Sequence, residues 1–377
     1  MPETLTDLLA ALVRLDSTNP ALVPGGAGET AIAHFVAHWL GGHGLQAELA
    51  EAAPGRPSVI ARVRGAGGGR SLLLNAHLDT VGAGGMARPF DPEVRDGRLY
   101  GRGSYDMKGG LAACLLALRD VRGAGLRGDV ILAAVADEEH ASLGTQSVLE
   151  RVSADAAIVT EPTELQLCVA HKGFIWHELT TFGRAAHGSR PDLGVDAIAH
   201  MGRVLGGLEA LGRDLAARPA HPLLGCASLH ASLISGGQEL SSYPDRCTLT
   251  AERRTLPGET PERVVQEMEA LLGTLRADPE FRAEHRLILA RDPFSVSCGA
   301  PIVQTLRQSA AGVLGAPPAL TGQTFWMDSA LLAAAGIPTV VFGPGGAGAH
   351  AAEEWVDLAS VARCREVLTS TIRNFCA

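Results

Sequence analysis

The stretch Ser71-Leu-Leu-Leu-Asn-Ala-His-Leu-Asp-Thr-Val81 indicates the class of fold. Leu72–Leu74 is an apolar run too short and too uniform for an amphipathic helix, so it predicts a buried strand. The strand leads into His77 and Asp79, two polar residues at its carboxyl end. Ligands of open α/β sheets bind beyond the carboxyl ends of the strands. His77 could therefore bind a metal with Asp79 orienting it, although a histidine that ends a strand is more often a satisfied polar group of the core.

Four further segments carry acidic or histidine side chains where a strand ends or a helix begins. The candidates are Asp106, Glu138, Glu139, Glu161 and His350. The apolar runs at 129–136, 156–160 and 337–342 predict the strands that precede all of them except Asp106. Asp106 follows a glycine-rich loop and precedes a predicted helix at 111–121, which it could simply cap. Because adjacent carboxylates repel each other, the run Asp137-Glu138-Glu139 favours a cation nearby.

Two imidazoles and three carboxylates together suit a pair of zinc-class ions, with one carboxylate bridging. Two-metal hydrolases hold their ions roughly 3.5–4 Å apart. Glu138, next to Glu139, is well placed to accept a proton from water. A second histidine pair, His34 and His38, is four residues apart on a helix predicted at 29–41, but it has no carboxylates beside it and suits a solvated helix face.

The composition excludes several kinds of partner. The 377 residues are 46% hydrophobic, which is enough for two domains with cores of their own. The net charge is −9 and no basic patch appears, so we expect no nucleic acid. No apolar run is long enough to cross a membrane. The seven cysteines are scattered and never spaced Cys-x-x-Cys, which favours a reducing cytoplasm over a disulfide framework.

A change of pattern between about Gly173 and Leu289 indicates a second domain. The expected order is strand–helix–strand–strand–helix–strand, typical of a small α+β sandwich. The predicted elements are 174–181, 196–211, 227–234, 247–253, 260–275 and 286–290. Because His350 has to return to the first domain's site, this domain should be an insertion. We therefore predict an α/β catalytic domain made of residues 1–173 and 291–377, interrupted by an inserted domain at 174–290.

These motifs resemble the di-zinc amidohydrolase and peptidase family that includes aminoacylase, acetylornithine deacetylase, succinyl-diaminopimelate desuccinylase and bacterial glutamate carboxypeptidase. They occur in the family's order and cover essentially the whole chain. The matching motifs are His77-x-Asp79, Gly101-Arg-Gly-Ser-Tyr-Asp106-Met-Lys-Gly-Gly110, Asp137-Glu138-Glu139, Glu161-Pro162, Ala186-His187-Gly-Ser-Arg-Pro191, Arg254-Thr-Leu-Pro-Gly258 and His350. The resemblance implies a mixed-sheet catalytic domain and a ferredoxin-like α+β insertion that acts as a lid and dimerisation domain.

The resemblance also implies a role for each metal ligand. His77 and Glu161 would bind one zinc ion, and Glu139 and His350 would bind the other. Asp106 would bridge the two ions. Cobalt or manganese could substitute for zinc.

Further roles implied by the resemblance concern the reaction itself. Asp79 would orient the imidazole of His77, and Glu138 would be the general base and then the acid to the leaving nitrogen. His187 would reach the partner subunit's site across a homodimer interface and stabilise the oxyanion. Arg254 matches the arginine that holds the substrate carboxylate.

Two positions depart from the family's pattern. Ser241, ahead of Pro244, stands where many members have asparagine, which puts a second contact from the partner subunit in doubt. Met327 replaces a threonine, whereas Asp328 keeps the acid of that motif and is a candidate for substrate binding. The neighbouring pair Phe325–Trp326 could shape an acyl pocket, although such aromatics are more often part of a core.

The resemblance implies hydrolysis of the amide bond of a small N-acyl amino acid, as in acetylornithine deacetylase or succinyl-diaminopimelate desuccinylase. A carboxypeptidase or dipeptidase on the same scaffold is the alternative, because only the acyl side of the substrate differs. A third reading is a catalytically silent binding module. The intact set of five ligands and a base disfavours it.

Overall fold

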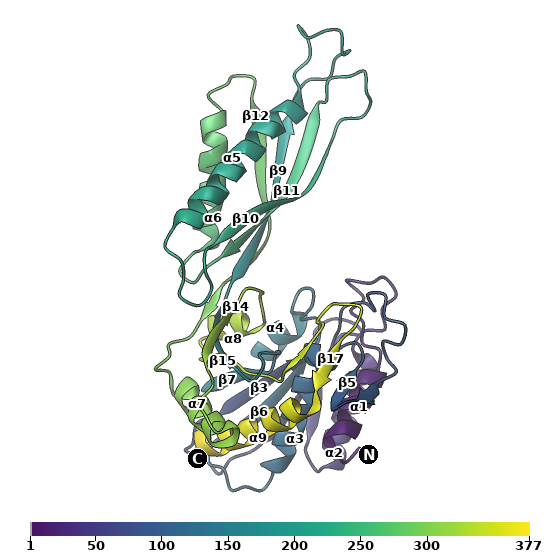
Figure 1. Ribbon diagram of the computed structural model, residues 1–377, viewed down its shortest axis with the longest axis vertical. Coiled ribbons are helices and arrows are strands. Elements are labelled where there is room, and N and C mark those ends of the chain that lie inside the picture. Colours follow the sequence, from purple (N-terminus) through teal and green to yellow (C-terminus); the bar gives the residue numbers. More distant parts are fainter. Residues whose placement is uncertain (1) are drawn as a thin grey trace. The chain divides into compact units, whose positions relative to one another are not determined.

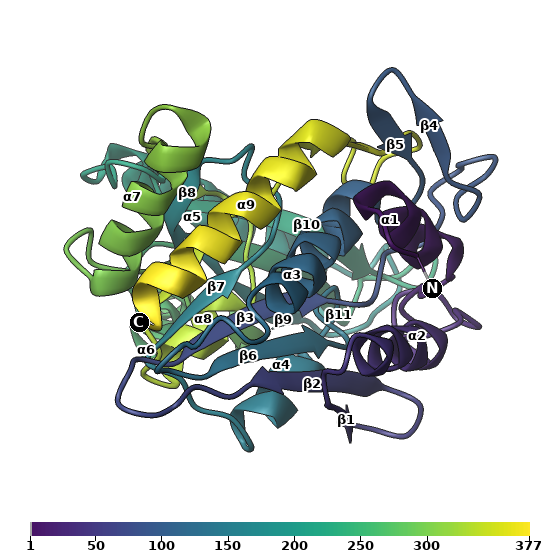
Figure 2. The same ribbon diagram turned by 90° about the horizontal axis from the view of Figure 1, so that it is seen from below.

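The apolar run of the opening stretch forms strand β3 (Leu72–His77), and every residue of the strand is buried. The computed structural model describes residues 2–377. β3 pairs in parallel with β6 (Val130–Val135) on one side and with β7 (Ala156–Val159) on the other. The sheet continues in the order β1-β2-β6-β3-β7-β15-β8, of which the part from β1 to β7 can be followed in Figure 2. The outer members are β1 (Ala47–Glu51), β2 (Pro57–Val63), β15 (Thr339–Val341) and β8 (Leu167–His171).

Both faces of this sheet are covered, which is why its strands are continuously apolar. Leu72 and Leu74 on one face join the larger hydrophobic core, and Leu73 on the other face joins a second core. Helices α3 (Gly109–Asp120) and α9 (Leu358–Phe375) contribute to the larger core (Figure 2). Helices α4 (Leu143–Leu149) and α8 (Ser329–Ala334) contribute to the second. The predicted α/β class with a mixed sheet is confirmed.

The direction of the strands brings the candidate residues to one edge. β15 is parallel to β7, which is parallel to β3, which is parallel to β6. The carboxyl ends of four strands therefore lie at the same edge of the sheet, where ligand sites of α/β proteins form. β1 and β2 are antiparallel additions that extend the sheet on the β6 side.

The smaller unit contains a separate antiparallel sheet of order β10-β11-β9-β12 (Figure 1). In chain order its elements are β9 (Gly173–Phe182), α5 (Ala197–Ala217), β10 (Ser228–Gly236), β11 (Arg246–Thr255), α6 (Pro261–Leu275) and β12 (Arg282–Arg291). This is the predicted strand–helix–strand–strand–helix–strand order. Alternate residues of β11, among them Leu249 and Ala251, pack with Met201 of α5 and Met268 of α6. The unit comprises Ala170–Ser295 with Gly322–Trp326.

The remaining elements are short or lie at the periphery of these sheets. They are α1 (Leu5–Arg14), α2 (Thr30–Gly42), β4 (Glu93–Arg95), β5 (Arg98–Tyr100), the π-helical turn η1 (Ser104–Lys108), β13 (Phe294–Ser295), α7 (Pro301–Leu314), β14 (Leu320–Gln323), β16 (Gly346–Ala347) and β17 (Trp355–Asp357). A third, small sheet has the order β16-β17-β5-β4. It joins the segment after His350 to the segment before Asp106.

A buried histidine pair in the smaller unit should make its stability depend on pH. His177 Nδ1 lies 2.8 Å from His285 Nε2, and His177 Nε2 is buried with no hydrogen-bond partner. Burial, followed by the charges of His285 and Arg253, lowers the pKa of His177 to about 4. The unfolded histidine has a pKa near 6.5, so the unfolded chain binds a proton that the folded chain does not. Stability should therefore fall as the pH drops from about 6.5 to about 4, by up to about 3 kcal/mol.

We expect His177→Gln to flatten this acid limb, as measured by urea unfolding midpoints at pH 7.5 and pH 5. The matched control is His230→Gln, which changes an exposed histidine of β10. An equal loss of stability between the two pH values in His177→Gln and in the unmutated protein would contradict the prediction.

Candidate metal centre

The ends of three neighbouring strands supply the first candidate ligands. His77 is the last residue of β3, Glu138 and Glu139 follow β6, and Glu161 follows β7. His77 is aligned with Val135 of β6, and the acidic run begins two residues after Val135. The structure thus brings together side chains that are up to 84 positions apart in the sequence because their strands are parallel neighbours.

Asp106 lies between two groups of candidate ligands and presents a different oxygen to each. Its Oδ1 is 3.1 Å from His77 Nε2, which is also 3.6 Å from Glu161 Oε1. Its Oδ2 is 3.3 Å from His350 Nε2, which is also 3.1 Å from Glu139 Oε2. A carboxylate that faces two donor groups through separate oxygens has the geometry of a bridging ligand. The five residues are therefore arranged as two adjoining sites that share Asp106.

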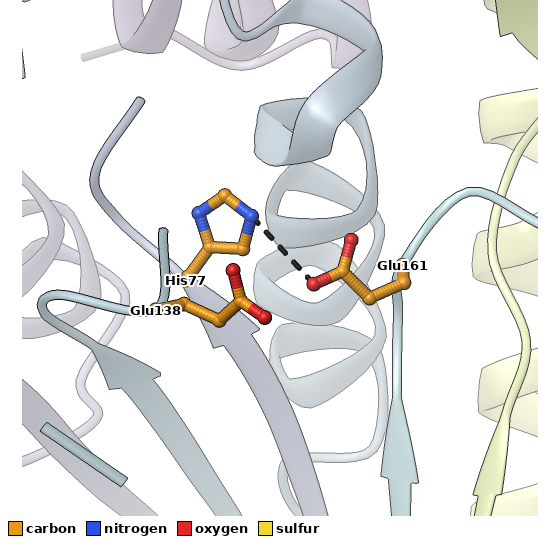
Figure 3. A group of neighbouring side chains, drawn as sticks. All are labelled: His77, Glu138 and Glu161. Atoms are coloured by element: carbon orange, nitrogen blue, oxygen red, sulfur yellow. Dashed lines mark ion pairs between the residues drawn. The ribbon is translucent and has the colours of Figure 1, made fainter. Parts of the chain in front are cut away.

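Glu138 lies on the His77 side of this arrangement. One atom each from His77, Glu138 and Glu161 can be chosen so that all lie within 4.8 Å of one another. The three side chains point toward a common space (Figure 3). One atom each from His77, Asp106 and Glu139 likewise lies within 4.8 Å of the others. Glu138 is therefore close enough to act on a water held between these residues, and also close enough to be a ligand itself.

The buried carboxylates of this cluster repel one another, and bound cations would offset that repulsion. Burial, and then repulsion from neighbouring carboxylates, raises the pKa of Glu138 and that of Glu139. Burial and the Asp106 and Glu139 charges likewise raise the pKa of Glu161, although His77 opposes them. Such buried carboxylates cost free energy unless they are paired or bind metal.

The imidazoles respond in the opposite direction. Burial opposes a charge on His77, but the carboxylates, Glu161 first, outweigh it and raise the pKa of His77 well above its usual value. Hydrogen bonds with Asp106 and Glu139 raise the pKa of His350 to about 10. The histidines thus stand in for positive charge that divalent ions would supply.

One orphaned atom shows that the residues fit such ions. Glu139 Oε1 is buried and has no hydrogen-bond partner, while its Oε2 faces His350. Together with two imidazoles and the other carboxylates, it completes a nitrogen and oxygen donor set of the kind that zinc-class ions bind. The side chains of the centre therefore fit two divalent ions.

Asp79 contacts both His77 and the segment after β6, and its expected role in orienting His77 stays a prediction. His77 Nδ1 lies 2.9 Å from the backbone oxygen of Asp79 and 3.6 Å from its carboxylate. The carboxylate accepts the backbone N–H groups of Glu138 at 3.1 Å and Glu139 at 3.2 Å. Asp79 therefore contacts His77 through its main chain and holds the acidic segment after β6 through its side chain.

A buried polar network behind Asp79 was not found from the sequence. Asn19 Nδ2 donates to Asp79 Oδ2 at 2.7 Å and to Asp137 Oδ1 at 3.0 Å. Arg56 pairs with Glu29 at 2.6 Å and with Asp137 at 2.8 Å. No sequence signal links Asn19 to Asp79. The network joins the ends of β3 and β6.

Asp328, expected to bind substrate, is fully buried in the larger unit. Its Oδ2 accepts a hydrogen bond from Thr145 Oγ1 at 2.5 Å, and its Oδ1 has no partner. Burial raises its pKa to about 6 against the lowering effect of Thr145. Met327, the departure from the family's pattern, belongs to the second core. The role of Asp328 stays a prediction.

His187 and Arg254 belong to the smaller unit, and their roles also stay predictions. His187 is exposed, and its Nδ1 lies 2.8 Å from Ser189 Oγ. Arg254 is partly exposed and donates through Nε to Glu252 at 2.7 Å. Trp326, of the aromatic pair, packs edge-on to Phe174 in the same unit at 6.4 Å between ring centroids.

Among residues 2–377, no helix is long and apolar enough to span a membrane.

Comparison with known proteins relates the whole chain to metal-dependent hydrolases. It is 30% identical over 391 residues to an acetylornithine deacetylase of Myxococcus xanthus, with 99% of this chain and 97% of the relative covered. It is 29% identical over 368 residues to N-formyl-4-amino-5-aminomethyl-2-methylpyrimidine deformylase of Halalkalibacterium halodurans, with 88% and 86% covered. The crystal structure of aminopeptidase PepT from Bacillus cereus shares the fold at a TM-score of 0.81 and 20% identity, with 99% and 98% covered.

The model of peptidase family M20/M25/M40 matches residues 73–374, a range that contains all five candidate ligands and Glu138. The suspected relationship to the amidohydrolase and peptidase family is confirmed, and so is the expectation of a metal-dependent amidohydrolase. This chain belongs to peptidase family M20/M25/M40.

Proposed function

We propose that this protein is a deacylase that hydrolyses the amide bond of a small N-acyl amino acid. The observation that carries the proposal is the pair of adjoining donor groups that share Asp106, with Glu138 beside one of them. The similarity to an acetylornithine deacetylase along 99% of the chain supports an acyl amino acid as the class of substrate.

The ligands of the two ions follow the distances in the centre. His77 and Glu161 would hold one ion, Glu139 and His350 the other, and Asp106 both. Two divalent ions, with zinc as the expected metal, supply a Lewis acid for the scissile carbonyl and activate water near neutral pH.

Glu138 performs the proton transfers of the proposed reaction. Its carboxylate accepts a proton from the attacking water and later delivers it to the leaving nitrogen. Asp79 holds the backbone of Glu138 in place through the hydrogen bond to its N–H.

The partner of the proposed enzyme is a second copy of the same chain. As part of the proposal, the inserted domain forms a homodimer, His187 contacts the oxyanion in the partner subunit's site, and Arg254 binds the substrate carboxylate. We also place the protein in the cytoplasm, in keeping with the spacing of its cysteines.

The proposed activity is tested by incubating the zinc- or cobalt-loaded protein with N-acetyl, N-succinyl and N-formyl amino acids and with dipeptides. Mass spectrometry of the products identifies the bond that is cleaved. We expect release of a free amino acid from at least one N-acyl amino acid. Cleavage of dipeptides alone would replace the deacylase by a peptidase on the same scaffold, and no cleavage of any amide would refute the proposal.

We expect the protein to bind two divalent ions per chain, because five ligands exceed what a single tetrahedral site takes. Elemental analysis after reconstitution should give two equivalents, and activity should recover in two steps as metal is titrated into the chelated protein. Full activity at a saturated single equivalent would contradict this expectation.

A further inference from the structure

Glu354 is a buried carboxylate whose oxygens are all used by one short loop. Only 1% of the residue is exposed. Its Oε1 accepts the backbone N–H groups of Tyr105 at 2.9 Å and Asp106 at 3.0 Å. Its Oε2 accepts the N–H of Gly103 at 3.0 Å and Arg102 Nη1 at 2.6 Å. With four donors already bound, Glu354 is not itself placed to bind metal.

Arg102 also binds the segment that carries His350. Its side chain is also 1% exposed, and its Nη2 donates to the backbone oxygen of Ala351, the residue after His350, at 2.8 Å. The backbone is joined as well, because the N–H of Gly101 donates to the carbonyl oxygen of Glu354 at 3.1 Å. The segment from Gly101 to Asp106 donates all of these hydrogen bonds, which join it to the segment from His350 to Glu354.

A gain in stability is a weak explanation for the buried ion pair of Arg102 and Glu354. A buried ion pair often stabilises a fold no more than apolar residues of similar volume would. A rigid acceptor with two oxygens does, however, fix the direction of the backbone at Asp106 in a way that an apolar side chain cannot.

The two segments tied by Glu354 carry the two ligands that meet on one side of the centre. Asp106 Oδ2 and His350 Nε2 are 3.3 Å apart. By contrast, His77 and Glu161 continue from β3 and β7, whose ladder hydrogen bonds hold them independently of Glu354. Removal of Glu354 should therefore disturb the site of Glu139 and His350 more than the site of His77 and Glu161.

We propose that Glu354 is a positioning residue that sets the Asp106 carboxylate and the His350 imidazole for the ion held by Glu139 and His350. The inference rests on the proposed two-ion function. Arg102 acts with Glu354 by neutralising its charge and by holding the main chain next to His350.

The test is zinc titration calorimetry of the full-length chain, freed of metal by a chelator, for Glu354→Gln and for the unmutated protein. Glutamine has nearly the same shape, but its amide nitrogen must face backbone or Arg102 donors. We expect one of the two binding steps to lose about ten- to a hundredfold in affinity, as for other residues that orient metal ligands, while the other step changes by less than about threefold. The matched control is Glu353→Gln, an exposed acid one position away, for which both steps should stay unchanged.

Two outcomes would overturn the inference: both steps unchanged in Glu354→Gln, or both steps weakened equally together with a lower melting temperature. If Glu354→Gln does not fold, Glu354→Asp decides in the same way, because it keeps the charge but shortens the side chain by one methylene. A single zinc ion bound by the unmutated protein would instead refute the proposed two-ion function.

Discussion

Glu138→Gln should lower turnover by about 10²- to 10⁴-fold while the protein keeps its fold and both ions. The amide cannot accept the proton of the attacking water, so the first chemical step loses its base. The side chain keeps its size, and the hydrogen bond between the Glu138 N–H and Asp79 does not involve the part that changes. Turnover on the best substrate of the panel and elemental analysis of the same preparation measure the two effects separately.

Glu139→Gln is the matched variant, because it makes the same change one residue further along. Glu139 Oε2 faces His350 and its Oε1 is buried without a partner, so this variant should lose metal. Glu138 is also close enough to His77 and Glu161 to be a metal ligand. The comparison of the two variants therefore decides whether Glu138 is a ligand or the base. Equal loss of metal in both variants would mean that Glu138 is a ligand and that another group is the base.

The sequence predicts the fold where a chemical pattern coincides with an element of secondary structure. Buried strands read as apolar runs, and parallel strands place their carboxyl ends at one edge. His77, Glu139 and Glu161 could therefore be expected to meet. Asp106 was less certain, because an aspartate ahead of a helix is also a common cap. In the structure its two oxygens face two different histidines, a relationship that no local pattern encodes.

Contacts between distant polar residues could not be predicted. Arg102 and Glu354 are 252 positions apart, and Asn19 and Asp137 are 118 apart. No local pattern around any one of these residues indicates its partner. Only the folded chain shows that they are buried and paired. The carboxylate of Asp79 also accepts hydrogen bonds from the segment after β6, which no pattern around Asp79 indicates.

The boundaries of helices and strands could be predicted where a local signal sets them, and not where pairing with another strand sets them. Helix α6 was predicted well, since Thr260 caps it and Pro261 occupies its first turn. The last strand of the smaller unit was expected at 286–290 but spans Arg282–Arg291. Its pairing with β9 extends it, and its first residues carry no apolar pattern of their own. The small sheet β16-β17-β5-β4 went unnoticed because its strands have only two or three residues each.

His187→Ala should be nearly inactive by itself and should regain activity when mixed with Glu138→Gln. His187 lies in the smaller unit, is exposed, and is none of the five ligands. The large effect is expected from the proposed function, in which His187 contacts the oxyanion in the partner subunit's site. In an isologous dimer each site would then combine Glu138 of one chain with His187 of the other.

The mixture separates this arrangement from one within a single chain. A mixed dimer would contain one site with both groups intact and one site lacking both. Random exchange makes half of the dimers mixed, so activity should recover to roughly a quarter of the unmutated level. Native mass spectrometry has to show that subunits have exchanged. If exchange is complete and activity does not return, His187 acts within its own chain or has no part in catalysis, because a shared site would have been restored in every mixed dimer.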